Sequence, residues 1–221
     1  MKNSSIKAIN PMIYEKMSNG EEIYSDVYSR LLKDRIIFLG EEITDELANC
    51  IISQMLWLDK QSQDEEINLY INSGGGDLIG CFSLYDIMQF IKSPVYTFVI
   101  GIAASAAAVL LCAGTKGKRF SLPSSQIMIH QPSCYGLEGQ TTDITINAKQ
   151  MERDKKKMLN ILARHTGKTY EQVQRDCERD FYLDPTMAIK YGLIDAITTP
   201  AKELPPILHE SRFNKNKYHN R

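Results

Sequence analysis

The sequence predicts an α/β fold with a mainly parallel sheet, and three observations support this prediction. Apolar runs typical of buried strands, such as RIIFL at 35–39, alternate with stretches whose apolar residues recur at helical spacing. The alternation continues through most of the 221 residues. Two of the runs lead into glycine-containing segments that precede a predicted helix, which is typical of strand-to-helix junctions in α/β proteins.

The predicted elements follow one another without an internal repeat or an internal linker. The polar residues 1–24 predict a mobile leader, residues 25–199 a single domain, and the Pro-, Lys- and Asn-rich residues 200–221 a loose tail. Helical spacing predicts helices at 24–33, 45–59, 78–91, 105–112, 142–166, 170–179 and 185–191. Apolar runs predict strands at 35–39, 67–72, 95–100, 118–122, 126–130 and 193–197.

The bulk composition is that of an ordinary globular protein, with 43% hydrophobic and 24% charged residues. The formal net charge of −1 gives no electrostatic reason to expect a nucleic-acid or membrane partner. The most apolar stretch, 95–113, is rich in alanine and contains Gly101 and Ser105. We therefore interpret it as a buried strand, a tight turn at Gly101 and a buried helix, rather than as a membrane span.

Five cysteines occur at wide spacings and without a CxxC pair, which argues against a disulfide framework and a structural zinc site. Cys50, Cys81 and Cys112 lie in apolar runs and are predicted to be buried. The first ten residues are too short and polar for a signal peptide. The cysteine pattern predicts a reducing compartment.

Two residues at predicted strand ends are candidates for nucleophilic catalysis. Ser105 lies where a strand gives way to a helix, whose free N–H groups and dipole favour an anion such as a tetrahedral intermediate. The alternative is a serine that merely caps the helix. His130 ends the strand QIMIH and could act as a general base, or it could be a core histidine with a satisfied hydrogen bond.

Local sequence does not identify the carboxylate or the oxyanion donors that such a site would need. A carboxylate must orient the histidine, and the spacing does not choose among Asp143, Asp176, Asp180, Asp184 and Asp195. The run SGGG at 73–76 could supply oxyanion N–H groups, bind an extended peptide, or form a simple turn. It lacks the spacing of a phosphate-binding loop.

Longer motifs resemble the proteolytic subunits of the caseinolytic (Clp) ATP-dependent protease, and they cover roughly residues 11–198. They occur in the order of that family. The motifs are YSRLLKDRIIFLGEEI, LYINSGGG, YDIMQFIKSPV, GIAASAAAVLLCAGTKGKRFSLP, IMIHQP, GQTTDI, ERDFYL and YGLIDAI. The resemblance implies a Clp-protease/crotonase-like fold of repeated β-β-α units with a protruding handle helix.

The resemblance also implies roles for individual residues. It places the nucleophile at Ser105, the base at His130 and the orienting acid at Asp180, all in one serine endopeptidase domain at 25–199. Oxyanion or substrate-binding groups are implied at Gly75, Gly76 and Ala106. An ATPase docking pocket is implied at Tyr70, Phe90 and Phe98, although buried aromatics more often belong to a core.

The chain departs from the family pattern at three places. Gly74 stands where the family has proline, Ala106-Ala107 stands where it has Met-Gly, and the loop 133–138 is about one residue longer. Both oxyanion donors are backbone groups, so these changes are compatible with activity. A catalytically weak or inactive ring-partner subunit is the alternative, and an acyl-CoA enzyme of crotonase type is a more distant one.

The resemblance further implies an assembly of two stacked seven-membered rings, formed by this chain alone or with paralogous subunits. A Clp-family AAA+ ATPase would feed unfolded polypeptides into the chamber and would use the ATP, so no cofactor or metal is expected on this chain. Residues 1–24 would include an axial segment, with cleavage before Ala8 as one hypothesis. The compartment would be the cytoplasm, or the stroma or matrix of an organelle of bacterial origin.

Overall fold

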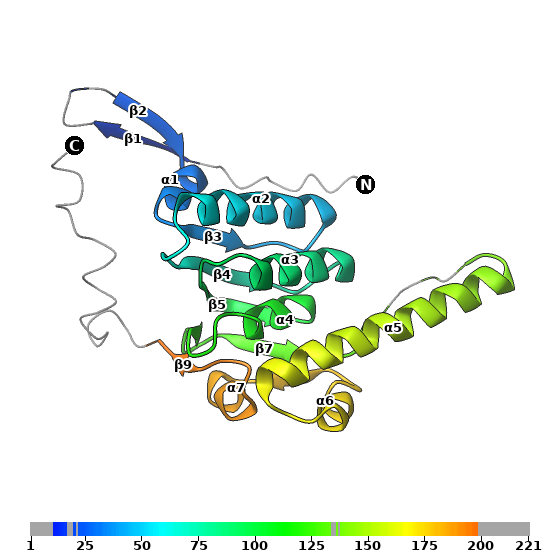
Figure 1. Ribbon diagram of the computed structural model, residues 1–221. Coiled ribbons are helices and arrows are strands. Elements are labelled where there is room, and N and C mark those ends of the chain that lie inside the picture. The colour runs from blue at the N-terminus through cyan, green and yellow to red at the C-terminus, as the bar shows by residue number, and fades with distance from the viewer. Residues whose placement is uncertain (1–10, 17–19, 21, 134–135, 137, 199–221) are drawn as a thin grey trace, which may run out of the picture.

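A seven-stranded sheet runs through the computed structural model, which describes residues 11–16, 20, 22–133, 136 and 138–198 (Figure 1). Five parallel strands follow in the order β3-β4-β5-β6-β9, and β7 and β8 continue the sheet beside β5. The strand bounds are β3 (Ile36–Leu39), β4 (Ile67–Ser73), β5 (Val95–Ala104), β6 (Arg119–Ser121), β7 (Gln126–Ile129), β8 (Phe181–Leu183) and β9 (Ala196–Ile197). The predicted α/β fold with a mainly parallel sheet is confirmed.

Strand β5 is the longest strand and pairs with two different neighbours along its length. Residues 97–99 pair in parallel with β6, and residues 102–104 pair in parallel with β7. Strand β8 then pairs antiparallel with β7. The second half of β5 therefore lies beside β7, and the carboxyl ends of these two strands meet at one edge of the sheet.

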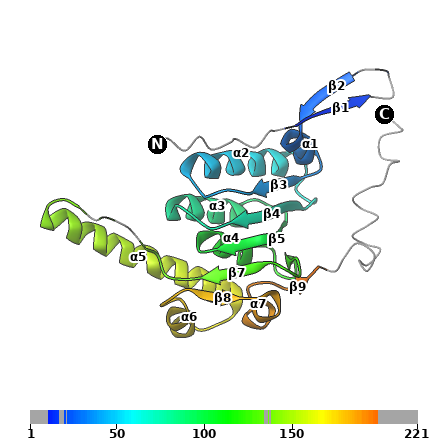
Figure 2. The ribbon, with the colours of Figure 1, turned by 180° about the vertical axis from the view of Figure 1, so that it is seen from behind.

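Helices α2, α3 and α4 cover one face of the sheet, as the two opposite views show (Figures 1 and 2). Side chains on this face, including Leu39, Ile71 and Val99, are buried beneath the helices. The helix bounds are α1 (Val27–Lys33), α2 (Asp45–Gln61), α3 (Leu78–Phe90), α4 (Ala106–Cys112), α5 (Thr141–Thr166), α6 (Tyr170–Asp176) and α7 (Pro185–Tyr191). Since side chains alternate between faces along a strand, the other face presents a different set of residues.

Aromatic side chains form a stacked column on that other face. Phe38, Tyr70, Phe98 and Phe120 are directly paired across β3, β4, β5 and β6, with ring centroids 5.4, 4.8 and 5.0 Å apart. Tyr28 of α1 adds an edge-on contact to Phe38 at 6.4 Å. Aromatic pairs of this kind stabilise adjacent strands beyond the area they bury.

Side-chain caps and glycines explain where several helices begin and end. Thr44, Asp77 and Asp184 each accept a hydrogen bond from the backbone N–H three residues further on, which satisfies a donor at the helix start. Gly167 and Gly192 follow α5 and α7 in the left-handed conformation that commonly ends a helix.

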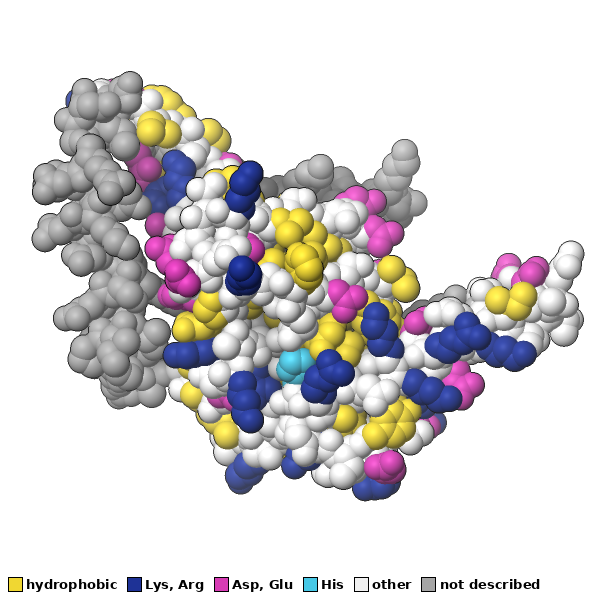
Figure 3. All heavy atoms as spheres, viewed as in Figure 1, with side chains coloured by type: hydrophobic (Ala, Val, Ile, Leu, Met, Phe, Trp, Pro, Cys, Tyr) yellow, Lys and Arg dark blue, Asp and Glu magenta, His cyan; other side chains and the backbone are white. Residues whose placement is uncertain are grey.

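Helix α5 is the protruding helix that the resemblance implied, and it extends well beyond the body of the molecule (Figure 1). It has 26 residues, and its buried residues Met158, Leu159, Ile161 and Leu162 all lie in its carboxyl-terminal part. The preceding turns carry no buried residue, and lysine and arginine side chains line the visible face of the helix (Figure 3).

Several predictions differ from the structure. Strands β1 (Met12–Lys16) and β2 (Glu22–Asp26) form an antiparallel hairpin where a mobile leader was expected. Helix α1 consequently begins at Val27 instead of residue 24, because Asp26 caps it. Strand β5 continues through Gly101 to Ala104 without the predicted tight turn.

Further differences concern the carboxyl-terminal half and one cysteine. Helix α6 ends at Asp176, not at residue 179, and the unpredicted strand β8 follows it. Cys81 and Cys112 are buried as predicted, but Cys50 is exposed because it lies on the outer side of α2. The hypothesis of cleavage before Ala8, the tail 200–221 and part of the longer loop lie outside the described residues.

Candidate active site

The sheet brings Ser105, His130 and Asp180 together from three separate parts of the chain. Ser105 directly follows β5, His130 directly follows β7, and Asp180 directly precedes β8. Because β7 lies beside the end of β5 and β8 pairs antiparallel with β7, these three positions share one edge of the sheet. Topology alone thus explains how residues 25 and 50 positions apart come into contact.

The three side chains form a continuous hydrogen-bonded series. Ser105 Oγ lies 2.8 Å from His130 Nε2, and His130 Nδ1 lies 3.1 Å from Asp180 Oδ1. Both contacts are satisfied when Nδ1–H donates to the carboxylate and Nε2 accepts from the serine hydroxyl. In that tautomer, the imidazole can take the serine proton while the carboxylate stabilises the resulting positive charge.

The other four aspartates considered from the sequence are placed elsewhere. Asp176 accepts a hydrogen bond from Tyr191 Oη at 2.9 Å, Asp184 caps α7, and Asp195 pairs with Arg119 at 2.6 Å. Asp143 lies in the first turn of α5. Within the described residues, Asp180 is the carboxylate that contacts His130.

The backbone at Ser105 makes a sharp strand-to-helix turn. Ser105 has φ 56° and ψ −124°, a conformation that is strained for a residue other than glycine. Its N–H donates to Met128 O at 2.9 Å, which ties the turn to β7. The serine side chain makes no capping bond to α4, so the interpretation of Ser105 as a simple helix cap is wrong.

Helix α4 begins immediately after the serine. Ala106 occupies its first position, where the backbone N–H has no acceptor within the helix. All seven residues of α4 are buried, and most are small. A buried helix start next to Ser105 Oγ provides an N–H donor and a favourable dipole for a negative charge that develops there.

The glycine run lies against the serine. A Cβ atom at Gly75 would stand 2.8 Å from both Ala104 O and the Cβ of Ser105, so only glycine permits this close approach. The N–H of Gly75 donates to Ser73 Oγ at 3.1 Å and is therefore already used. Gly76 forms a parallel bridge with Ile43, which fixes the run against the segment that follows β3.

The proposed docking residues do not share one environment. Tyr70 and Phe98 belong to the stacked aromatic column, where Phe98 is only 6% exposed. Phe90, at the end of α3, is 79% exposed. Two of the three residues thus contribute to the packing of the sheet, while Phe90 leaves a large apolar ring in contact with solvent.

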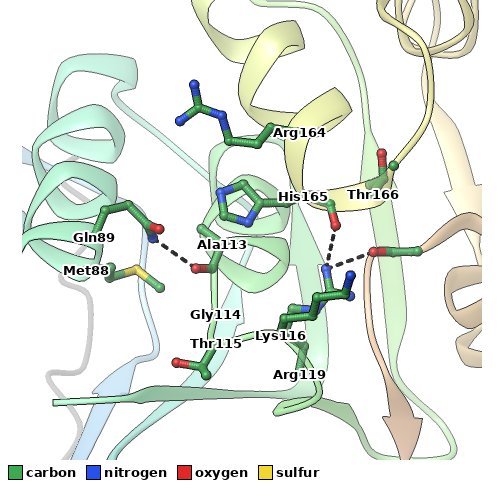
Figure 4. A pocket seen from close by; sticks show the side chains of 12 residues that line it. Met88, Gln89, Ala113, Gly114, Thr115, Lys116, Arg119, Arg164, His165 and Thr166 are labelled. Carbon is green, nitrogen blue, oxygen red and sulfur yellow. Dashed lines mark hydrogen bonds between the residues drawn. The ribbon is translucent and has the colours of Figure 1, made fainter. Parts of the chain in front are cut away.

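A cavity of about 400 Å³ lies near the opposite edge of the sheet, away from Ser105, and sequence reasoning did not predict it (Figure 4). The ends of α3, α4 and α5 line it, together with Arg119 at the start of β6. Arg119 donates to three backbone carbonyls, those of Cys112, His165 and Gly192, and binds both carboxylate oxygens of Asp195. Contacts spanning up to 76 residues leave no local sequence signal.

The described part of the chain offers no cluster of three or more His, Cys, Asp and Glu side chains that could hold a metal ion. In the same part of the chain, no helix combines the length and apolar character needed to cross a membrane.

This arrangement of serine, histidine and aspartate at the strand ends of an α/β sheet is the one found in serine hydrolases. The family model for Clp protease matches residues 18–201, a range that includes all three side chains and the glycine run. The chain belongs to the Clp protease family. The resemblance first noted in the motifs is thereby confirmed for most of the chain.

Proposed function

We propose that this chain is an active serine endopeptidase and the proteolytic subunit of an ATP-dependent Clp protease. The observation that carries the proposal is the series of contacts from Ser105 Oγ through His130 to Asp180, at 2.8 and 3.1 Å, in a member of this family. An inactive ring-partner subunit would have no need for this geometry.

The proposed reaction is acyl transfer through a covalent intermediate. Ser105 Oγ attacks the peptide carbonyl while His130 Nε2 takes its proton, and His130 then gives that proton to the leaving amine. Asp180 orients the imidazole and stabilises its charged form. Water hydrolyses the acyl-enzyme in the second half of the reaction, with His130 again acting as the base.

The oxyanion would be stabilised by backbone groups. We assign this role to the N–H groups of Ala106 and Gly76, since the N–H of Gly75 already donates to Ser73. Each such donor contributes about 3 kcal/mol in comparable sites. Neither departure removes a donor. Ala106-Ala107 keeps its backbone N–H groups, and Gly74 in place of proline adds an N–H and frees φ.

The proposed assembly follows from the family and fits two exposed features. Two stacked seven-membered rings would use α5, whose first turns bury nothing within this chain, as the element where the rings meet. A Clp-family AAA+ ATPase would dock at the exposed Phe90, because Tyr70 and Phe98 are engaged in the aromatic column. The ATPase would deliver unfolded polypeptides and use the ATP, and this chain would bind no cofactor.

The test compares wild type with Ser105→Ala and with Ser53→Ala, a control serine on α2 whose hydroxyl bonds to Asn49 O. Native mass spectrometry determines whether each variant assembles and how many subunits the particle contains. Cleavage of a fluorogenic peptide measures its activity. We expect Ser105→Ala to lose at least about 10³-fold in kcat and all labelling by a fluorophosphonate probe. Unchanged hydrolysis by assembled Ser105→Ala would overturn the proposal, as would an assembled wild type that is neither active nor labelled.

A further inference from the structure

Few contacts hold the carboxylate of Asp180 in place. Within the described residues, its one side-chain hydrogen bond is the 3.1 Å contact with His130 Nδ1, and the side chain is 56% exposed. A single bond to a solvent-exposed carboxylate does not fix its position. The position of Asp180 therefore depends on the backbone on both sides of it. After it, Phe181 of β8 pairs with Ile129 of β7, and before it lies the segment 177–180.

Gln131 ties that segment to the histidine. It directly follows His130, and its backbone N–H donates to Cys177 O at 2.7 Å. Its side-chain amide donates to Glu178 O at 3.1 Å. Gln131, the residue next to His130, thus makes two hydrogen bonds to the backbone that leads to Asp180. These bonds connect the segment that carries His130 to the segment that carries Asp180.

Lys155 of α5 holds the side chain of Gln131 in place. Lys155 Nζ donates to Gln131 Oε1 at 2.5 Å and lies 3.8 Å from Glu178 Oε2. With its Oε1 bound by the lysine, the amide of Gln131 keeps its NH₂ group directed at Glu178 O. The Lys155 side chain is only 26% exposed. Solvent and salt therefore screen its charge less than they screen the charges of a fully exposed ion pair.

The neighbouring lysines show that this contact is specific to Lys155. A charged run such as 154–157 on a long helix is ordinarily a solvated face. Lys156 pairs with Glu152 on the same helix and is 61% exposed, as expected of such a face. Lys157 lies over the ring of Phe82, 4.1 Å from its centroid. Of the three, Lys155 alone contacts the residues next to His130 and Asp180.

We propose that Gln131 and Lys155 are positioning residues that help to keep Asp180 within hydrogen-bonding distance of His130. The proposal rests on the proposed function, because it assigns Asp180 its orienting role. Neither residue contacts the reacting hydroxyl, so each acts through the segment 177–180. A displacement of about 1 Å in such an orienting group costs up to about 10²-fold in rate.

The first experiment compares Lys155→Met, Lys155→Arg and the matched control Lys156→Met, with kinetics measured on particles isolated by size. We expect kcat of Lys155→Met to fall about 10-fold or more with KM little changed, because substrate binding is not altered. Lys155→Arg, which keeps a cationic donor, should recover most of the rate. Lys156→Met should match wild type, since its salt bridge is exposed.

A second pair of variants removes the connection from the other side, without altering α5. Gln131→Leu loses both side-chain bonds, while Gln131→Glu keeps an acceptor for Lys155 but loses the donor to Glu178 O. We expect both to lower kcat and to slow fluorophosphonate labelling of Ser105, with Gln131→Leu the slower. These variants decide the question if Lys155→Met does not assemble.

The outcomes separate this inference from the proposed function. If Ser105→Ala still hydrolyses peptides, the proposed function fails. If Ser105→Ala is inactive while assembled Lys155→Met and Gln131→Leu keep wild-type kcat, only the positioning role fails. Equal losses in Lys155→Met and Lys156→Met would also overturn it, because the effect would then come from helix charge in general.

Discussion

The two edges of the sheet differ in how fully their polar groups are used. At the carboxyl ends of the strands, Ser105 has a strained backbone, and the exposed Asp180 makes one side-chain hydrogen bond within the described residues. At the amino ends, the side chain of Arg119 is 6% exposed, and its guanidinium donates to three carbonyls and to Asp195. At the carboxyl ends, polar groups remain available for reaction. At the amino ends, polar groups are hydrogen-bonded within the fold.

Helix α4 connects these two edges. Its amino terminus begins beside Ser105, and the carbonyl of its last residue, Cys112, accepts a hydrogen bond from Arg119 at 3.2 Å. The positive end of the helix dipole thus lies where an oxyanion would form, and a guanidinium lies at the negative end. The fold thus concentrates its stabilising contacts away from the residues proposed to react.

The largest effect on stability is expected at the amino edge. Arg119→Met would leave Asp195 without its cation and three carbonyls without a donor, so we expect a loss of about 3–5 kcal/mol in the free energy of unfolding. The control Lys118→Met removes only an exposed contact with the Tyr96 ring and should cost less than about 1 kcal/mol. Denaturant unfolding measures both. Equal, small losses would contradict the contrast.

A smaller and more local effect is expected at the carboxyl edge. Gly75→Ala places a Cβ 2.8 Å from Ala104 O at φ 101°, so we expect it to cost about 1–3 kcal/mol and to displace Ser105. Gly74→Ala meets open space and should stabilise by about 0.4–1 kcal/mol through the unfolded chain. Melting temperature and peptidase activity should separate the pair. A tolerated Gly75→Ala would show that close packing at Ser105 is not required.

The smallest expected effect is a pH dependence of stability that comes from His165 at the amino edge. Burial, followed by the charges of Arg119 and Arg164, lowers the pKa of His165. The folded state therefore binds a proton less readily than the unfolded chain, and stability should fall as the pH drops below about 6.5. His165→Gln should flatten this part of a melting-temperature profile between pH 7.5 and 5.5. An unchanged slope would assign the dependence to other groups.

Asp195, at the same edge, makes stability depend on pH in a lower pH range. The pKa of its carboxyl is lowered by hydrogen bonds and charge from Arg119, which outweigh the opposing effect of burial. Its stabilising contribution is present above its unfolded pKa and is lost as the pH falls toward the folded value. The His165→Gln comparison is therefore made above pH 5, where Asp195 remains ionised in both states.

Regular elements with a strong apolar pattern could be predicted from the sequence. The helix expected at 142–166 is found at Thr141–Thr166, and the strand expected at 67–72 at Ile67–Ser73. The hairpin at β1 and β2 was missed because its burial is only partial, which gives a weak alternation in a polar segment. Cys50 was misplaced because an apolar run does not reveal which side of a helix faces outward.

The candidate site could be predicted only in part from local sequence. The strand-to-helix junction indicated Ser105, but no spacing separated Asp180 from four other aspartates, because such sites are assembled in space. The resemblance to a family supplied that choice, and the structure shows the contact. The roles of Arg119 and Lys155 depend on partners in other elements, which no periodicity reveals.

The length of α5 determines how movement of its tip reaches the site. Its buried anchor begins at Met158, which is 158 − 141 = 17 positions from the first residue and 158 − 155 = 3 from Lys155. At 1.5 Å per residue these are lever arms of about 26 Å and about 4.5 Å. A rigid tilt that moves the tip by about 5 Å thus moves Lys155 by about 1 Å. Lys155 would thus move much less than the tip, so only a large displacement of the tip would break its contact with Gln131.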